Sequence, residues 1–125
     1  MFTLDGVRKF HGWTHASLKL VLDHLSTIPT TDYVRELPGF GFRTLREQAI
    51  HIFNCEGFWI HTLRGKRYAD RTIGEYFPDG DVAVRTPALV LHHVLTHAFH
   101  HKGQIVAMCR TFGHPAPDTD LNQFE

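Results

Sequence analysis

The chain has 125 residues, of which 42% are hydrophobic and 21% are charged. This length and composition are typical of one globular domain. Thirteen basic side chains balance thirteen acidic ones, so the formal net charge is zero. Zero net charge without a basic helix face argues against nucleic-acid binding, which relies on clustered Lys and Arg. The unusual feature is the number of histidines, which is eleven.

Several features bear on the cellular location. The first residues lack a basic segment followed by an apolar run, as a signal peptide would have. No apolar stretch approaches the roughly 20 residues that a membrane-spanning helix needs. Cys55 and Cys109 lie in apolar helical patterns and cannot build a disulfide framework, which is typical of reduced cysteines. We therefore expect a cytoplasmic protein whose partners include neither a membrane nor a nucleic acid.

Hydrophobic periodicity predicts three long amphipathic helices and no strand. They are expected over residues 3–27, 44–64 and 87–112. The second helix has Thr44 as its N-cap, with Glu47 three residues later as in a capping box. The third begins at Thr86-Pro87, an N-cap followed by proline at the first helical position. This inventory predicts a single all-α domain over residues 1–125, folded as an up-down helical bundle.

The last predicted helix carries two histidines, His97 and His101, at the edge of its apolar stripe. Residues four apart are neighbours on a helix, so their ring nitrogens can point to one metal ion. His51 on the second helix reaches a similar level if the two helices run antiparallel, and it can supply a third ligand. Such histidine pairs also arise by chance in a chain with eleven histidines, so spacing alone leaves metal binding open.

The first predicted helix holds a second pair, His11 and His15, near the centre of its apolar stripe. Core histidines usually hydrogen-bond to a backbone carbonyl or a carboxylate, which would make this pair structural. Alternatively, both line the same cavity as the metal, with His15 as a catalytic general base beside it.

The stretch His97-Ala-Phe-His-His-Lys-Gly-Gln-Ile105 resembles the last-helix signature of the DinB-like (YfiT-like) metal-binding helical bundles. The stretch over residues 45–59 is similar to the segment in which that family supplies its first metal ligand, and it contains His51. Trp13 and His15 resemble the family's first-helix pattern, although an asparagine often stands at the position of His15.

The resemblance covers about residues 1–65 and 86–121. It implies that His51, His97 and His101 bind one divalent transition metal ion. Imidazole suits several such metals, among which we expect Zn or Ni.

The resemblance also implies a fourth long helix that the sequence does not predict. Family members usually have it between the two ligand-bearing helices, but residues 66–85 are short and interrupted by Gly and Pro, and we interpret them as a loop. A three-helix bundle would leave an apolar groove beside the metal, and such surfaces are usually covered. We therefore expect a homodimer in which the partner chain covers this face. The alternative is that the loop itself folds over the groove.

The resemblance implies a metal-dependent thiol transferase or a related hydrolase-type enzyme, acting on a low-molecular-weight thiol or another small molecule. In this hypothesis the metal activates the nucleophile, and His15 or Glu56 orients or deprotonates it. For Glu56 a structural hydrogen bond is the alternative. The alternative function is a non-catalytic metal-binding or stress-response protein with a structural metal. A fourth protein ligand, such as His100, would favour that alternative.

Overall fold

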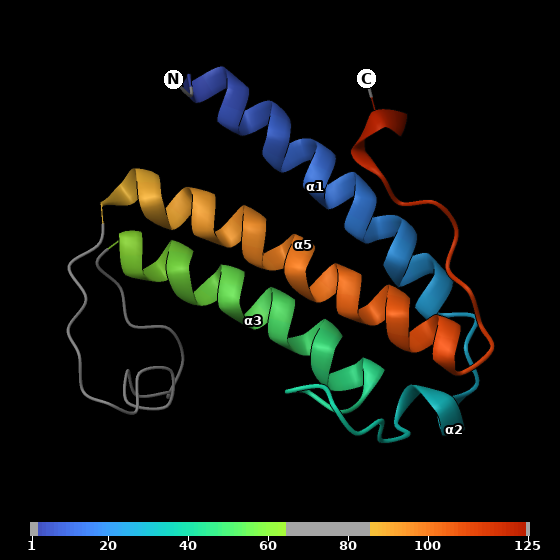
Figure 1. The fold of residues 1–125 in the computed structure, drawn as a ribbon. Helices are drawn as coiled ribbons and strands as arrows, with labels where there is room; N and C mark the ends of the chain where they lie inside the picture. The colour runs from blue at the N-terminus through green and yellow to red at the C-terminus, as the bar shows by residue number, and fades with distance from the viewer. Residues whose placement is uncertain (1–2, 65–85, 125) are drawn as a thin grey trace.

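The computed structural model describes residues 3–64 and 86–124. Three long helices pack side by side (Figure 1), namely α1 (Leu4–Leu25), α3 (Leu45–Leu63) and α5 (Pro87–Thr111). The described residues also form a short helix, α2 (Thr30–Tyr33), and one 3-10 turn, η1 (Leu121–Gln123), but no strand. The predicted all-α class is therefore confirmed.

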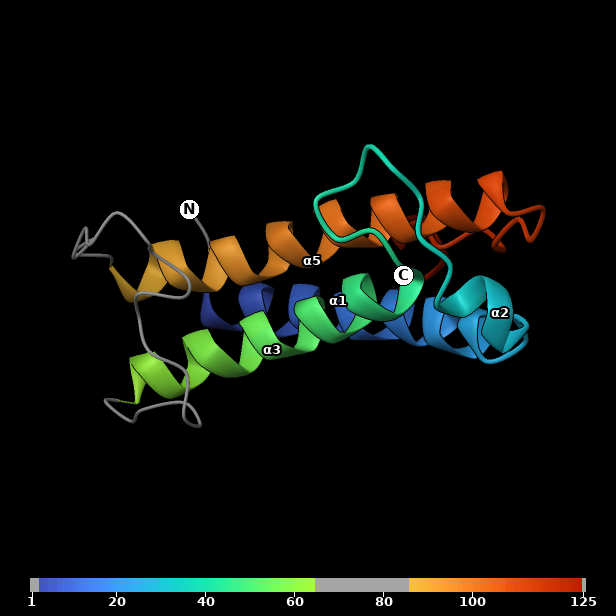
Figure 2. The ribbon, with the colours of Figure 1, turned by 90° about the horizontal axis from the view of Figure 1, so that it is seen from below.

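The long helices alternate in direction along the chain. Helices α1 and α5 run the same way, and α3 runs opposite to both (Figures 1 and 2). Helix α5 contacts both of the others, and its contact with α3 is the more extensive. The antiparallel arrangement of α3 and α5 is the one that the predicted histidine site requires.

Local capping explains where α3 and α5 begin. The Thr44 hydroxyl accepts from the Glu47 backbone N–H at 3.0 Å, and the Glu47 carboxylate accepts from the Thr44 N–H at 3.1 Å. This is the capping box expected from the sequence. The Thr86 hydroxyl likewise accepts from the Leu89 N–H at 3.2 Å, next to a proline in the first turn.

The hydrophobic core lies where the three long helices meet. Its most buried apolar members include Val21 on α1, Leu45 and Ile52 on α3, and Ile105 and Met108 on α5. Cys55 and Cys109 are both buried, and no disulfide joins them. Burial raises the pKa of Cys109 to about 11, so this thiol stays protonated at neutral pH.

A buried lysine fastens the C-terminal segment to the bundle. The Lys102 ammonium donates to the Ser17 hydroxyl at 3.0 Å and to the Thr119 carbonyl at 2.8 Å. The Ser17 hydroxyl donates to the same carbonyl at 2.6 Å. Burial lowers the pKa of Lys102, and the carboxylates of Asp118 and Asp120 act in the opposite direction. The basic residue of the last-helix signature thus holds the segment after α5 against α1.

Among the residues that the structure describes, we find no helix that could span a lipid bilayer. The predicted loop over residues 66–85, and with it the predicted lack of a fourth long helix, lies outside the described residues. The extent of the single domain stays a prediction.

Candidate metal centre

Three histidines from two helices meet between α3 and α5. Ligand nitrogens of His51, His97 and His101 all lie within 4.8 Å of one another. The Nε2 atoms of His51 and His97 are 3.1 Å apart, and the ring centroids of the three are 4.4–4.9 Å apart. Nitrogens bound at about 2.0–2.1 Å to one tetrahedral ion would be about 3.3 Å apart. The donor set and its spacing therefore fit a divalent transition metal ion.

The surroundings favour the neutral form of two of these imidazoles, those of His97 and His101. His101 is buried and the other two are partly buried. Burial lowers the pKa of His97 to about 4, with further lowering by His101, His93 and His100. Burial also lowers the pKa of His101 to about 4, with further lowering by His51 and His100. A neutral imidazole has a lone pair to donate, so His97 and His101 can each bind a metal ion at pH 7.

A buried glutamine orients His101. The Nδ1–H of His101 donates to the Gln48 side-chain oxygen at 2.7 Å, which leaves Nε2 as the nitrogen available for a ligand. The Gln48 amide nitrogen in turn donates to the Phe42 carbonyl at 2.9 Å and to the Gln104 side-chain oxygen at 2.6 Å. Gln48 is fully buried, and each of its amide atoms has a partner. Sequence reasoning missed it, although it lies one turn before His51 on the same helix.

Phe42, in the segment before α3, covers one side of the histidine cluster. Its ring stacks on that of His51 with 4.1 Å between centroids. It meets His101 edge-on at 5.8 Å. This contact screens the two imidazoles from water and adds to the burial that lowers the pKa of His101.

Cys55 lies beside the three-histidine cluster. Its Sγ is 3.5 Å from Nε2 of His51, one helical turn away. The group of mutually close ligand atoms nevertheless contains only the three histidines among the described residues. His100 is also outside it, and its Nε2 accepts from the Gln104 side-chain nitrogen at 2.8 Å.

His15 does not join the three-histidine group. Its Nε2 lies 2.9 Å from Oε1 of Glu56 on α3, and Nε2 of His11 lies 3.0 Å from the same oxygen. These three residues form a second group whose ligand atoms are within 4.8 Å of one another. The two imidazoles are well exposed rather than in the core, with side-chain exposures of 45% for His11 and 43% for His15. Their common partner is the Glu56 carboxylate. A carboxylate is one of the two kinds of hydrogen-bond partner that the sequence predicts if this histidine pair is structural.

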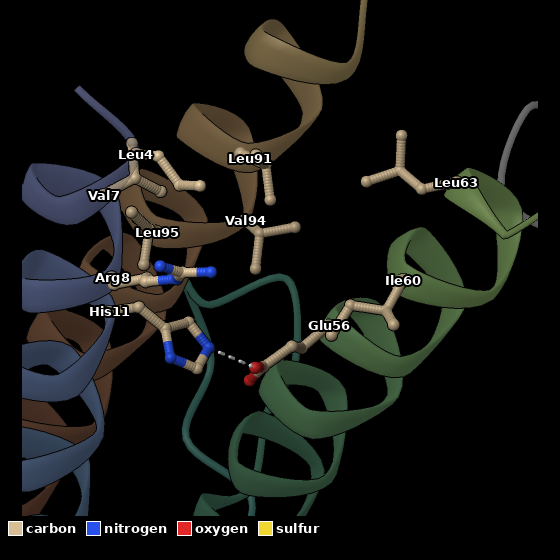
Figure 3. A pocket seen from close by; sticks show the side chains of 10 residues that line it. All are labelled: Leu4, Val7, Arg8, His11, Glu56, Ile60, Leu63, Leu91, Val94 and Leu95. Atoms are coloured by element: carbon tan, nitrogen blue, oxygen red, sulfur yellow. Dashed lines mark hydrogen bonds and ion pairs between the residues drawn. The ribbon is translucent and has the colours of Figure 1, made fainter. Parts of the chain in front are cut away.

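An apolar pocket of about 260 Å³ extends from this second group toward the N-terminal end of α1 and the C-terminal end of α3 (Figure 3). Glu56 and His11 stand at one edge of it, joined by their contact. Arg8 is the other polar residue that lines it, and the remaining lining is aliphatic, from α1, α3 and α5. None of the three histidines lines this pocket, whereas the sequence predicted an apolar groove beside the metal.

Fold and site together describe an all-α bundle with a candidate three-histidine metal centre between two antiparallel helices. The sequence model of the DinB family matches residues 67–125. The matched segment includes His97 and His101, whereas His51 lies N-terminal to it. It supports the assignment of this chain to the DinB-like family. No curated protein and no solved structure matches the chain.

The lowered pKa values of His97 and His101 predict how the stability of the metal-free chain varies with pH. Unfolding returns both imidazoles to their usual pKa of about 6.5, so the unfolded chain binds more protons between pH 6.5 and 4. The free energy of unfolding should therefore fall as the pH is lowered through this range. Urea unfolding at pH 7 and pH 5, with a chelator present, measures the fall.

Replacing both residues by asparagine (His97→Asn with His101→Asn) should make the difference between the two pH values smaller. His92→Asn, on the same helix outside the cluster, is the matched control and should keep the wild-type difference. An unchanged difference in the double variant would contradict the assigned cause.

Proposed function

We propose that this protein binds one divalent transition metal ion through His51, His97 and His101. Zn and Ni are the metals that we expect. The observation that carries the proposal is that three imidazoles from α3 and α5 each place a ligand nitrogen within 4.8 Å of the other two. The match of the α5 segment to the DinB family supports it. Three neutral ligands leave a bound ion its full positive charge.

The residues around the cluster have distinct parts in this proposal. Gln48 selects the His101 tautomer and fixes the plane of its ring. Phe42 excludes water from one side. A divalent ion held there supplies Lewis acidity, which lowers the pKa of a thiol or water and polarises a substrate oxygen.

We further propose that the activity is a metal-dependent transfer to or from a low-molecular-weight thiol, or a related hydrolysis. The three-member ligand group supports this, because a catalytic site keeps a coordination position open whereas a structural site is closed by four protein ligands. The assignment of His15 as a catalytic base remains a prediction from the sequence.

The metal proposal predicts loss of metal from two single variants. His97→Ala and His101→Ala each remove one of three ligands, so each should lower metal affinity by at least about 10-fold, the usual cost of losing even an outer-shell partner. The measurement is elemental analysis after dialysis of the full chain against equimolar Zn²⁺ or Ni²⁺. His92→Ala is the matched control on α5, since its Nδ1 bonds to the Ala88 carbonyl of its own helix. A metal content in both variants equal to that of the wild type would end the proposal.

An open coordination position predicts a spectroscopic response to a thiol. The Co²⁺-substituted protein should gain a thiolate-to-cobalt charge-transfer band in the near ultraviolet when 2-mercaptoethanol is added. The His97→Ala protein should gain a weaker band than the wild type, and this difference would tie the response to the three-histidine group. A metal-loaded wild-type protein without this response would favour the structural-metal alternative.

We also propose that the chain is a homodimer whose partner covers the groove between α1 and α3. Two leucines at its rim support this, since Leu4 and Leu63 are 63% and 38% exposed. Sedimentation of the wild type at micromolar concentration should give the dimer mass, and Leu63→Glu should shift it to the monomer. Leu22→Glu is the control, because Leu22 is similarly exposed (40%) but lies outside this groove. A wild-type monomer at that concentration would contradict the dimer.

A further inference from the structure

The group formed by His11, His15 and Glu56 is independent of the three-histidine group. His51 and Glu56 are five residues apart on α3, which places them about 140° apart around the helix and about 7.5 Å along it. His51 meets α5, whereas Glu56 meets two side chains of α1. The second group is thus on another side of α3.

The second group has the atoms and the spacing of a known type of metal site. Two imidazoles and one carboxylate are the ligands of the facial sites that hold Fe²⁺ and similar ions. Ligand atoms at about 2.1 Å from an ion, at right angles to one another, lie about 3.0 Å apart. The Nε2 atoms of His11 and His15 lie 3.0 and 2.9 Å from one Glu56 oxygen. The rings of the two histidines are one turn apart on α1, with centroids 4.2 Å apart.

The largely buried Glu56 carboxylate of this group needs a positive charge nearby to compensate its own. The Glu56 side chain is only 14% exposed, and a charge withdrawn from water is costly unless it is compensated. Neutral imidazoles satisfy the carboxylate oxygen by hydrogen bonding but add no charge. A divalent ion would supply the charge and use the same three atoms. A protonated imidazole is the competing source of charge, and the two accounts differ in whether the group binds a metal.

The second group borders the apolar pocket, so a cation bound to the group would lie next to any molecule in that pocket. Glu56 and His11 line one edge of an otherwise largely aliphatic pocket of about 260 Å³ (Figure 3). A small apolar molecule in that pocket would lie next to a cation on these residues. Three protein ligands on one side of an ion leave its remaining positions free for such a molecule or for water.

We propose that His11, His15 and Glu56 form a second divalent-metal site, suited to Fe²⁺, Co²⁺, Mn²⁺ or Zn²⁺. A metal ion on Nε2 of His15 uses the lone pair that a base would need, so this proposal makes His15 a ligand instead of a catalytic base. It goes beyond the proposed three-histidine function, because either site can exist without the other.

The test is the number of Co²⁺ ions bound per chain, from equilibrium dialysis of the full chain followed by elemental analysis. The wild type should bind two ions and Glu56→Gln should bind one. The double variant His97→Ala with His101→Ala should also retain one ion, and this ion should be lost when Glu56→Gln is added. Glutamine keeps an oxygen that accepts hydrogen bonds from both imidazoles, so a merely hydrogen-bonded cluster would tolerate it. Far-ultraviolet circular dichroism checks that each variant is folded.

Asp23→Asn is the matched control, because it removes one negative charge from an exposed residue of α1 that pairs with Lys19. It should bind two ions like the wild type. His15→Asn is a second variant at the site and should lower the affinity for the second ion by at least about 10-fold. If Glu56→Gln binds as much Co²⁺ as the wild type, the second site does not exist. A wild type that binds one ion, lost in the double variant, would overturn this proposal while leaving the three-histidine function standing.

Discussion

The antiparallel packing of α3 against α5 is the constraint on which the candidate metal centre depends. It brings His51 to the level of His97 and His101 although they are more than forty residues apart in the chain. The cluster lies within the apolar contact between these helices, so the same burial that stabilises the bundle also lowers the pKa of two of its members. A substitution that changes the packing of α3 against α5 near the cluster should therefore also change the pKa values of these histidines. A metal site of this type needs little beyond two well-registered helices and neutral imidazoles.

The fold and the three-histidine group could be predicted because both follow from helical periodicity. The i, i+4 spacing of His97 and His101 and the depth of His51 are properties of regular helices, and regular helices formed. The hydrogen bond from His101 to Gln48 could not be predicted in the same way. It depends on how the irregular segment before α3 places the Phe42 carbonyl, which fixes the glutamine amide. Irregular backbone leaves no periodic signal in the sequence.

The pairing of α1 with Glu56 shows a different limit. The sequence placed His11 and His15 in the apolar stripe of the first helix, but it did not give the rotation of that helix about its axis. In the structure both rings reach the edge of the helix contact, where they are more than two-fifths exposed and share one carboxylate oxygen. A small rotation decides between a core position and a groove position, and tertiary packing sets it. Helix α3 consequently carries polar clusters on two of its sides, with aliphatic packing between them.

The hydrogen bonds of the Lys102 ammonium limit how far the C-terminal segment can be shortened. Lys102 follows His101 directly, and its hydrogen bonds reach across to Ser17 and to the Thr119 carbonyl. A chain shortened before Thr119 would leave a buried ammonium with one partner fewer, next to a residue of the candidate metal centre. The irregular C-terminal segment is thus a structural part of the bundle, and trimming it as a dispensable tail would disturb the helix turn that presents His101.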